Sequence, residues 1–375
     1  MTAEVWITGI GLVSSLGEGA GPHLAALADP AFPPVLDRDS FAPCTIHPLP
    51  ALPFEAQMPR RDLRQMETWQ RLGVYAAGLA LDSAAAKPLA AEIDLMVAAG
   101  GGERDVALDQ AILTELAAVP EAERPAWLNQ RIAGGLRPTL FLAQLPNLLA
   151  GSITIVHGVA RSSRTLMGME LAGADALRLA LSRVAHGGSA MTLVGASLNP
   201  SRWDELMTYG TAGLNWQAEW LPVAQRPAPG GICLGGLGCF LLLEEAGHAR
   251  ARGATPFARL AHVGTGMAQR QGQDTATASA AGLLAALRDR LRPGAAVLSA
   301  ASGAAATAEE AAFLASTGAG PARFTADVLG HGVEASFPAA IALAALQTQA
   351  GLAPQTLVSG FGAWRGEALG LVEAV

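Results

Sequence analysis

The chain has 375 residues, of which 51% are hydrophobic and only 15% are charged. Because the usual charged share is about 25%, this composition excludes a disordered chain and predicts a large core or an extensive subunit interface. The net charge of −7 argues against nucleic acid or an anionic membrane as a partner.

The cysteines and the N-terminus indicate where the protein works. Cys44, Cys233 and Cys239 have no Cys-x-x-Cys spacing, so neither a disulfide framework nor a zinc site is expected. The chain begins MTAEVWITGI, without the basic start or cleavage site of a signal peptide, and no apolar run reaches about 18 residues. We therefore expect a cytoplasmic protein without a membrane span.

Short apolar segments without alternation recur along the chain and predict strands that are buried on both faces. In chain order they lie at 4–14, 94–99, 191–194, 240–243 and 296–300. Helices rich in alanine and leucine are predicted between them, at 172–185 and 334–346. The segment 103–137 carries most of the charge of the middle of the chain, so we expect it to form a more exposed excursion.

Several of these stretches resemble the β-ketoacyl-(acyl carrier protein) synthases, which are condensing enzymes of the thiolase fold. The chain opens with VWITGIGLVSSLGEG, continues with MPRRDLRQMETWQRLGVYAAGLAL and MVAAGGG, and closes with SGFGAW. The strongest match is internal, ICLGGLGCFLLLEEAGHARARGA, followed later by VLGHGVEASFPAAIALAAL.

This resemblance implies an α/β architecture of two similar βαβαβαββ halves in a five-layer α-β-α-β-α sandwich. Residues 1–230 would form the N-terminal half, with interface and cap insertions, and residues 231–375 the C-terminal half. No cofactor and no metal are expected.

The family's nucleophile is a cysteine at a helix N-terminus, where backbone N–H groups stabilise thiolate and oxyanion. Residues 147–173 are similar to the family's elbow region without a gap, and this places Glu170 at the nucleophile position. The distance to the glycine that closes the next strand agrees, since Gly195 follows 25 positions later (195 − 170).

The resemblance also locates the other catalytic positions of the family, which are two histidines and a lysine. The first histidine corresponds to Ser302 or, in a second register, to Ala301. Ala326 falls at the lysine position. Only the second histidine is retained, as His331, so one of the family's four catalytic groups remains.

The role of Glu170 at the nucleophile position must therefore be something other than catalysis. A carboxylate at a helix N-terminus accepts hydrogen bonds from backbone N–H groups. We therefore predict that Glu170 accepts from the N–H donors of an oxyanion hole that holds no substrate. In chain-length-factor subunits, which pair with active polyketide ketosynthases, a polar amide commonly stands at this position. We therefore predict a non-catalytic partner subunit of an active β-ketoacyl synthase that meets acyl carrier protein through the complex.

Three further residues are candidates for a tunnel or gate, and one segment for the dimer contact. The loop 141–149 corresponds to the region that borders the dimer interface and acyl tunnel in the family, so Phe141 and Leu145 are expected to shape that tunnel. A strand is expected at 152–156 and is our candidate for the edge that pairs across the dimer. Phe361 resembles the family's gating residue, although the second aromatic expected near Ala363 is missing.

Two other functions remain open at this point. A malonyl-carrier-protein decarboxylase replaces the cysteine but keeps both histidines, whereas this chain lacks the first. An active condensing enzyme would require a cysteine near a helix start, and Cys233 lies 63 positions from Glu170 (233 − 170). The product of the synthase complex is also left open: it could be a very-long-chain acyl group for lipid A, a polyketide or an aryl polyene.

Overall fold

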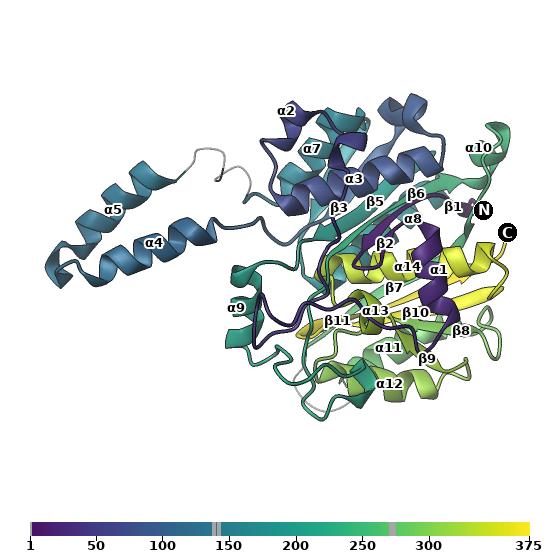
Figure 1. The fold of residues 1–375 in the computed structure, drawn as a ribbon. Coiled ribbons are helices and arrows are strands. Elements are labelled where there is room, and N and C mark those ends of the chain that lie inside the picture. Colours follow the sequence, from purple (N-terminus) through teal and green to yellow (C-terminus); the bar gives the residue numbers. More distant parts are fainter. Residues whose placement is uncertain (1, 137–139, 141–143, 270–274) are drawn as a thin grey trace.

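A computed structural model describes residues 2–136, 140, 144–269 and 275–375 (Figure 1). The described strands form one mixed sheet of 11 strands, with β2 (Gly17–Glu18) paired to β1 beside the main path. The order along that path is β4 (Ser162–Leu166), β3 (Asp94–Ala98), β5 (Met191–Leu198), β6 (Leu237–Glu245), β1 (Val5–Ser14), β7 (Ala258–Gln269), β11 (Arg365–Glu373), β10 (Gln355–Phe361), β8 (Ala296–Ser299) and β9 (Ala322–Phe324).

The sheet consists of two halves that are joined at one point. β1 pairs with β6 along its whole length, but it pairs with β7 only through Trp6–Arg259 and Ile7–Ala258. The first half therefore runs from β4 to β1, and the second from β7 to β9. The strands predicted from apolar segments are confirmed as β1, β3, β5, β6 and β8. The division at residue 230 stays a prediction.

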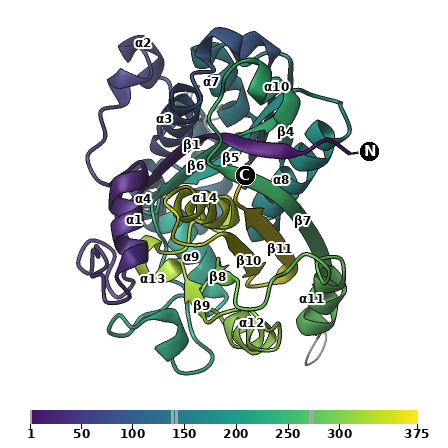
Figure 2. The ribbon, with the colours of Figure 1, turned by 90° about the vertical axis from the view of Figure 1, so that its right-hand side faces the viewer.

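Helices cover and separate the two half-sheets. α3 (Thr68–Ser83) and α7 (Asn147–His157) pack on the outer face of the first half, and α11 (Thr275–Ala285) and α12 (Ala306–Ala315) pack on the outer face of the second. Between the halves lie α8 (Glu170–Ala185) and α14 (Ser336–Gln349); Figure 2 shows α14 enclosed by strands on both sides. This arrangement confirms the expected five-layer sandwich.

The two central helices approach closely because small residues face each other. Every residue from Ser336 to Thr348 of α14 is buried, and alanine is its commonest residue. At Gly173 of α8, an added Cβ would lie 1.9 Å from the carbonyl oxygen of Glu334. Only glycine permits this approach, which brings the start of α8 against the segment that leads into α14.

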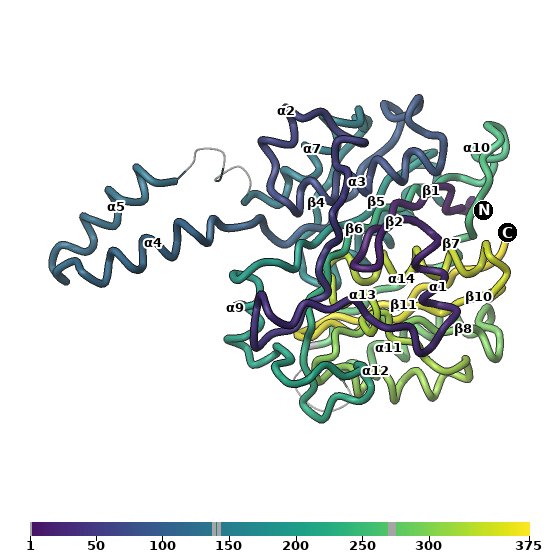
Figure 3. Tube along the Cα trace, viewed as in Figure 1, coloured from purple at the N-terminus to yellow at the C-terminus, as the bar shows by residue number. Residues whose placement is uncertain are grey.

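The shorter elements complete the chain around this sandwich. The helices are α1 (Ala20–Ala28), α2 (Arg60–Leu63), α4 (Val106–Ala117), α5 (Arg124–Gly135), α9 (Trp203–Thr211), α10 (Ala246–Ala251) and α13 (Ala326–Leu329). The 3-10 turns are η1 (Phe54–Ala56), η2 (Lys87–Glu92), η3 (Glu121–Glu123), η4 (Val223–Gln225) and η5 (Val333–Ala335). Both termini lie on the same side of the molecule (Figure 3). None of the described helices combines the length and apolar character that a membrane span requires.

The excursion expected at 103–137 is a helical hairpin over its described part. α4 and α5 project away from the sandwich as an arm (Figure 1). They are joined by the ion pair between Arg131 and Glu115, whose Nε and Oε2 atoms lie 2.7 Å apart. Within α4 and α5, Ile112 is the one buried residue, so most of the surface of this arm is exposed.

The strand expected at 152–156 is wrong, because these residues lie within α7. The run of β-branched residues there suggested a strand. However, the buried residues Leu149, Ala150 and Ile153 follow helical spacing and pack toward α3. Gly158, with φ of 73°, ends the helix in the left-handed conformation that glycine adopts without strain.

Candidate functional site

The elbow that carries Glu170 is a sharp turn between a strand and a helix. β4 ends at Leu166, and α8 begins at Glu170. Between them, Met169 adopts φ of 54° and ψ of −139°, a conformation that a residue with a side chain rarely adopts. Such strain clusters at functional sites, and here it directs the first residue of a central helix toward the C-terminal half.

The carboxylate of Glu170 is held by groups from that half. The backbone N–H of Ala363 donates to its Oε1 at 3.1 Å, and the Nε2 atom of His331 lies 3.3 Å from the same oxygen. Its own backbone N–H at the start of α8 also donates to it. The side chain is only 13% exposed, so these contacts replace water around the charge.

The charge state of Glu170 follows from a balance of burial and partners. Burial acts to raise its pKa, but the contact with His331 and the two backbone N–H groups outweigh it and hold the pKa below its usual value. The carboxylate is therefore ionised at neutral pH. Because it accepts from its own N–H and that of Ala363, these donors are not free for a substrate oxyanion.

His331 is positioned by the turn between α13 and α14. Its backbone N–H donates to the carbonyl of Cys233 at 2.8 Å. The ring is 1% exposed, and its Nδ1 atom lies 3.3 Å from the hydroxyl of Ser336. The ring thus spans from the start of α14 to Glu170 and has no open face toward solvent.

Phe361 lies at the end of β10, where a buried glutamate determines the path of the turn. The Glu310 carboxylate accepts from the backbone N–H of Phe361 at 2.8 Å and from the hydroxyls of Ser299 and Ser359. The Phe361 ring packs at 5.8 Å from that of Phe313 and is 2% exposed. The turn that carries the N–H of Ala363 is therefore rigid.

The space beside Glu170 is almost closed. The cavity there has a volume of about 10 Å³ and is bounded by Glu170, Ala300, Phe337 and Phe361, among others. A single water needs about 10–15 Å³, so an acyl thioester does not fit in this state.

The residues expected at the positions of the first histidine and the lysine supply no acid or base. Ser302 is buried, and its hydroxyl accepts from the backbone N–H of Ala304 at 3.2 Å, while Ala301 is also fully buried. Ala326 begins α13 and carries only a methyl group. Its neighbour Asp327 accepts from the backbone N–H of Val223 at 2.6 Å.

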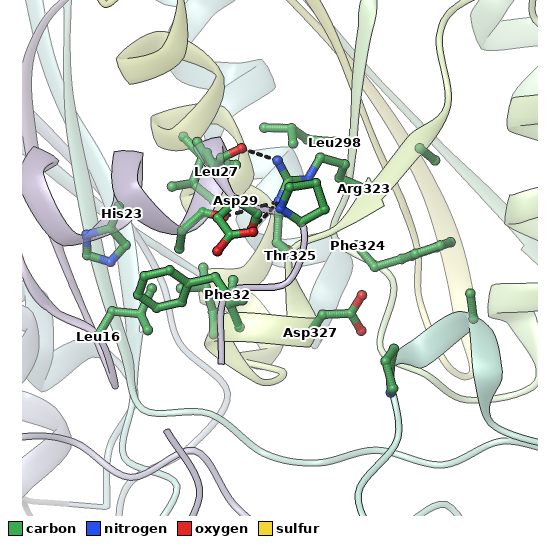
Figure 4. Close-up of a pocket in the computed structure, with 18 of the residues that line it drawn as sticks. Leu16, His23, Leu27, Asp29, Phe32, Leu298, Arg323, Phe324, Thr325 and Asp327 are labelled. Carbon is green, nitrogen blue, oxygen red and sulfur yellow. Dashed lines mark hydrogen bonds between the residues drawn. The ribbon is translucent and has the colours of Figure 1, made fainter. Parts of the chain in front are cut away.

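Asp327 borders a cavity of about 350 Å³ that lies between α1 and the β9–α13 segment (Figure 4). The guanidinium of Arg323 points across it and donates to the carbonyl oxygens of Ala26, Leu27 and Asp29, at the end of α1. This cation therefore caps a helix C-terminus and does not replace the missing lysine.

Of the tunnel candidates, Leu145 lies in the N-terminal part of the chain and Phe361 lies in the C-terminal part. Leu145 is half-buried at the base of the arm, next to Gln144, whose carbonyl accepts from the N–H of Gly102 at 3.2 Å. Phe141 lies outside the described residues, so its expected contribution to a tunnel stays a prediction.

A second cavity, of about 260 Å³, lies beside the elbow and was not expected from the sequence. Met169, Arg202, Glu205 and Glu334 contribute to its lining. Burial raises the pKa of Glu334 to about 7, and it also raises that of Glu205. The only signal in the sequence is a glutamate at 334, within the otherwise apolar start of a helix.

Comparisons with known proteins agree with this geometry. No protein-family model and no curated protein matches the sequence. Among solved structures, the ishigamide ketosynthase/chain length factor matches with a TM-score of 0.78 at 18% identity, covering 100% of both chains. A β-ketoacyl synthase from Burkholderia phymatum matches with a TM-score of 0.78 at 19% identity, again over 100% of both chains.

A third structure holds a type II polyketide acyl-carrier protein in complex with its ketosynthase bound to the hexaketide. It matches with a TM-score of 0.77 at 16% identity and covers 100% of both chains. The chain therefore has the thiolase fold of the ketosynthases and chain length factors, as its sequence predicts.

Removal of the Glu170 carboxylate is expected to destabilise the protein. Glu170→Ala leaves the Ala363 N–H and His331 without their acceptor, and unpaired buried groups cost about 1–3 kcal/mol. Glu170→Gln keeps one carbonyl acceptor and should lose less than half as much. Urea unfolding at neutral pH measures both; equal losses in the two variants would contradict this account of the site.

Glu334→Gln is expected to remove part of the pH dependence of stability. The folded pKa is raised to about 7, whereas an unfolded glutamate titrates near 4.3. Between these values the unfolded state binds fewer protons, so the stability of the wild type falls as pH rises. At about pH 8 the variant should be more stable by up to about 3 kcal/mol, and the two should converge near pH 4. Urea unfolding across this range measures the difference, and parallel curves would refute the expectation.

Proposed function

We propose that this chain is a non-catalytic, chain-length-factor-like subunit that pairs with an active β-ketoacyl synthase. The observation that carries the proposal is the Glu170 carboxylate, which occupies the N–H groups of Glu170 and Ala363 at the elbow. Condensation needs a nucleophile and free oxyanion donors at this point. In this proposal the Glu170 carboxylate stands in place of the nucleophile and accepts the hydrogen bonds that the oxyanion would otherwise receive.

The other catalytic positions support the same conclusion. Ser302 and Ala326 offer no group that could stabilise a decarboxylating malonyl unit. The Nε2 atom of His331 lies 3.3 Å from the Glu170 carboxylate, so it faces a carboxylate and not a substrate. A decarboxylase that relies on a histidine pair is therefore the weaker alternative.

The surface for a partner lies at the free edge of the first half-sheet. Among the described strands, β4 pairs only with β3, so its other edge is open to a further strand. Exposed apolar side chains flank this edge: Met167 is 66% exposed, and Ile155 of α7 is 77% exposed. The arm formed by α4 and α5 projects from the same half and can reach across a partner (Figure 1).

In the complex, this chain would shape the product rather than make it. Leu145 at the base of the arm is our described candidate for the tunnel wall, and Phe141 is the second. Carrier protein would meet this chain through the complex, as one of the similar structures holds a carrier protein with its ketosynthase. The product belongs to fatty acyl or polyketide chemistry.

The isolated chain is expected to form no acyl adduct and to release no carbon dioxide. Incubation with acyl- and malonyl-carrier protein, followed by intact-mass analysis and carbon dioxide measurement, tests both. Glu170→Cys should not restore condensation, because Ser302 and Ala326 still lack the required groups. A stable adduct would refute the proposal, and release abolished by His331→Ala would favour the decarboxylase.

Co-expression with an active ketosynthase is expected to yield a heterodimer. Met167→Glu and Ile155→Glu place charges on the proposed contact and should weaken the complex by at least about tenfold. Leu352→Glu is the matched control, because Leu352 is 58% exposed after α14 and away from β4. Size-exclusion chromatography and titration measure the association.

Product analysis of the same complex tests the tunnel. Leu145→Ala should shift product length while the partner's nucleophile stays reactive. A stable monomer that ignores the ketosynthase, or an unchanged product with Leu145→Ala, would contradict the proposed role.

A further inference from the structure

The cavity of about 350 Å³ between α1 and the β9–α13 segment has mostly apolar walls (Figure 4). Aromatic rings from three separate segments contribute to these walls: Phe32 follows α1, Trp220 precedes η4, and Phe324 ends β9. Four leucines extend the apolar surface, namely Leu16, Leu298, Leu329 and Leu343. A concave site of this size and lining is typical of those that bind small organic molecules.

Contacts within the protein hold the walls of this cavity in place. The guanidinium of Arg323 donates to the carbonyl oxygens of Ala26 and Asp29, at 3.1 and 3.4 Å, and so fixes the end of α1 against β9. His23, on the α1 side, is fully buried, and both of its ring nitrogens are engaged within the protein. Because the walls are fixed before a ligand enters, binding requires little further ordering of the protein.

One carboxyl group interrupts the apolar walls. The Oδ1 atom of Asp327 accepts from the backbone N–H of Val223 at 2.6 Å, whereas its Oδ2 atom has no hydrogen-bond partner among the described residues. Asp327 is half-buried, and Oδ2 retains accessible surface. Burial raises the pKa of this carboxyl group, as expected where few donors stabilise the charge. The cavity therefore offers one acceptor that a ligand can satisfy.

The charges around Asp327 favour a neutral ligand. The guanidinium groups of Arg226 and Arg323 both act on its charge, so they would repel an organic cation at the same place. An organic anion would in turn meet the Asp327 carboxylate. A neutral N–H or O–H group can donate to the carboxylate without either repulsion.

We propose that this cavity binds a neutral, planar aromatic molecule that carries an N–H or O–H donor. The aromatic ring packs against Phe32 and Phe324, and the donor binds Oδ2 of Asp327. Aromatic pairs gain more than the burial of their area alone, and a hydrogen bond to a carboxylate is stronger than one between neutral groups. Glu170 and His331 are not among the described residues that line this cavity, so the site is separate from the elbow.

Calorimetric titration of the full chain with indole at neutral pH tests the site. Saturable binding is expected. Benzofuran has the same ring shape as indole, but an ether oxygen replaces the N–H group. It should bind at least about tenfold more weakly, because the hydrogen bond to a charged acceptor is lost.

Variants separate the donor contact from the packing of the ring. Asp327→Asn keeps an oxygen for the Val223 N–H but turns an amide NH₂ toward the cavity, so it should abolish the preference for indole. Phe32→Ala should weaken indole and benzofuran by a similar factor, of about threefold or more. Asp289→Asn, an exposed control outside the cavity wall, should bind as the wild type does. Urea unfolding confirms that each variant is folded.

Three outcomes would overturn the proposal. The first is that indole does not bind saturably to the wild type, or binds only as well as benzofuran. The second is a preference for indole that survives Asp327→Asn. The third is binding that Phe32→Ala leaves unchanged, since the ligand would then lie elsewhere. The isolated chain is used throughout, so the result does not depend on the proposed pairing with a ketosynthase.

Discussion

The site depends on the contacts that the Glu170 carboxylate, at the start of α8, makes with Ala363 and His331. A buried carboxylate without partners costs several kcal/mol, so Ala363 and His331 must both be in place. These partners come from the C-terminal part of the chain, whereas Glu170 belongs to the N-terminal part. The contacts of one carboxylate therefore keep the elbow, the His331 turn and the Ala363 turn together.

The packing of the sandwich makes this pairing rigid. Gly173 lets α8 lie against the backbone of Glu334, and Glu310 holds the turn that leads to Ala363 through the Phe361 N–H. Since buried polar networks are costly when they are only partly satisfied, a change at Glu310 would also disturb the partner of Glu170. The closed cavity of about 10 Å³ is the result of these two close approaches.

Much of this arrangement could be predicted from local patterns, and the rest depends on distant contacts. The helix that follows Glu170 and the helix after His331 follow from apolar spacing, whereas β4, which leads into the elbow, was not predicted. The β-branched residues of 152–156 misled the prediction, because burial against α3 outweighs strand propensity there. Glu205 and Glu334 were missed, since they are 129 residues apart (334 − 205) and only folding brings them to one cavity.

Two neighbouring glutamates show how partners decide the role of a buried acid. Glu170 has a histidine and backbone donors, and its pKa is held low, so it stays charged and closes the elbow. Glu334 is also buried, but among the described residues its hydrogen-bond donor is its own backbone N–H, and the charge of Glu170 is one of the causes that raise its pKa. The charge at the elbow therefore favours the neutral form of the adjacent carboxyl group. This coupling links the ionised carboxylate at the elbow to the polar character of the cavity beside it.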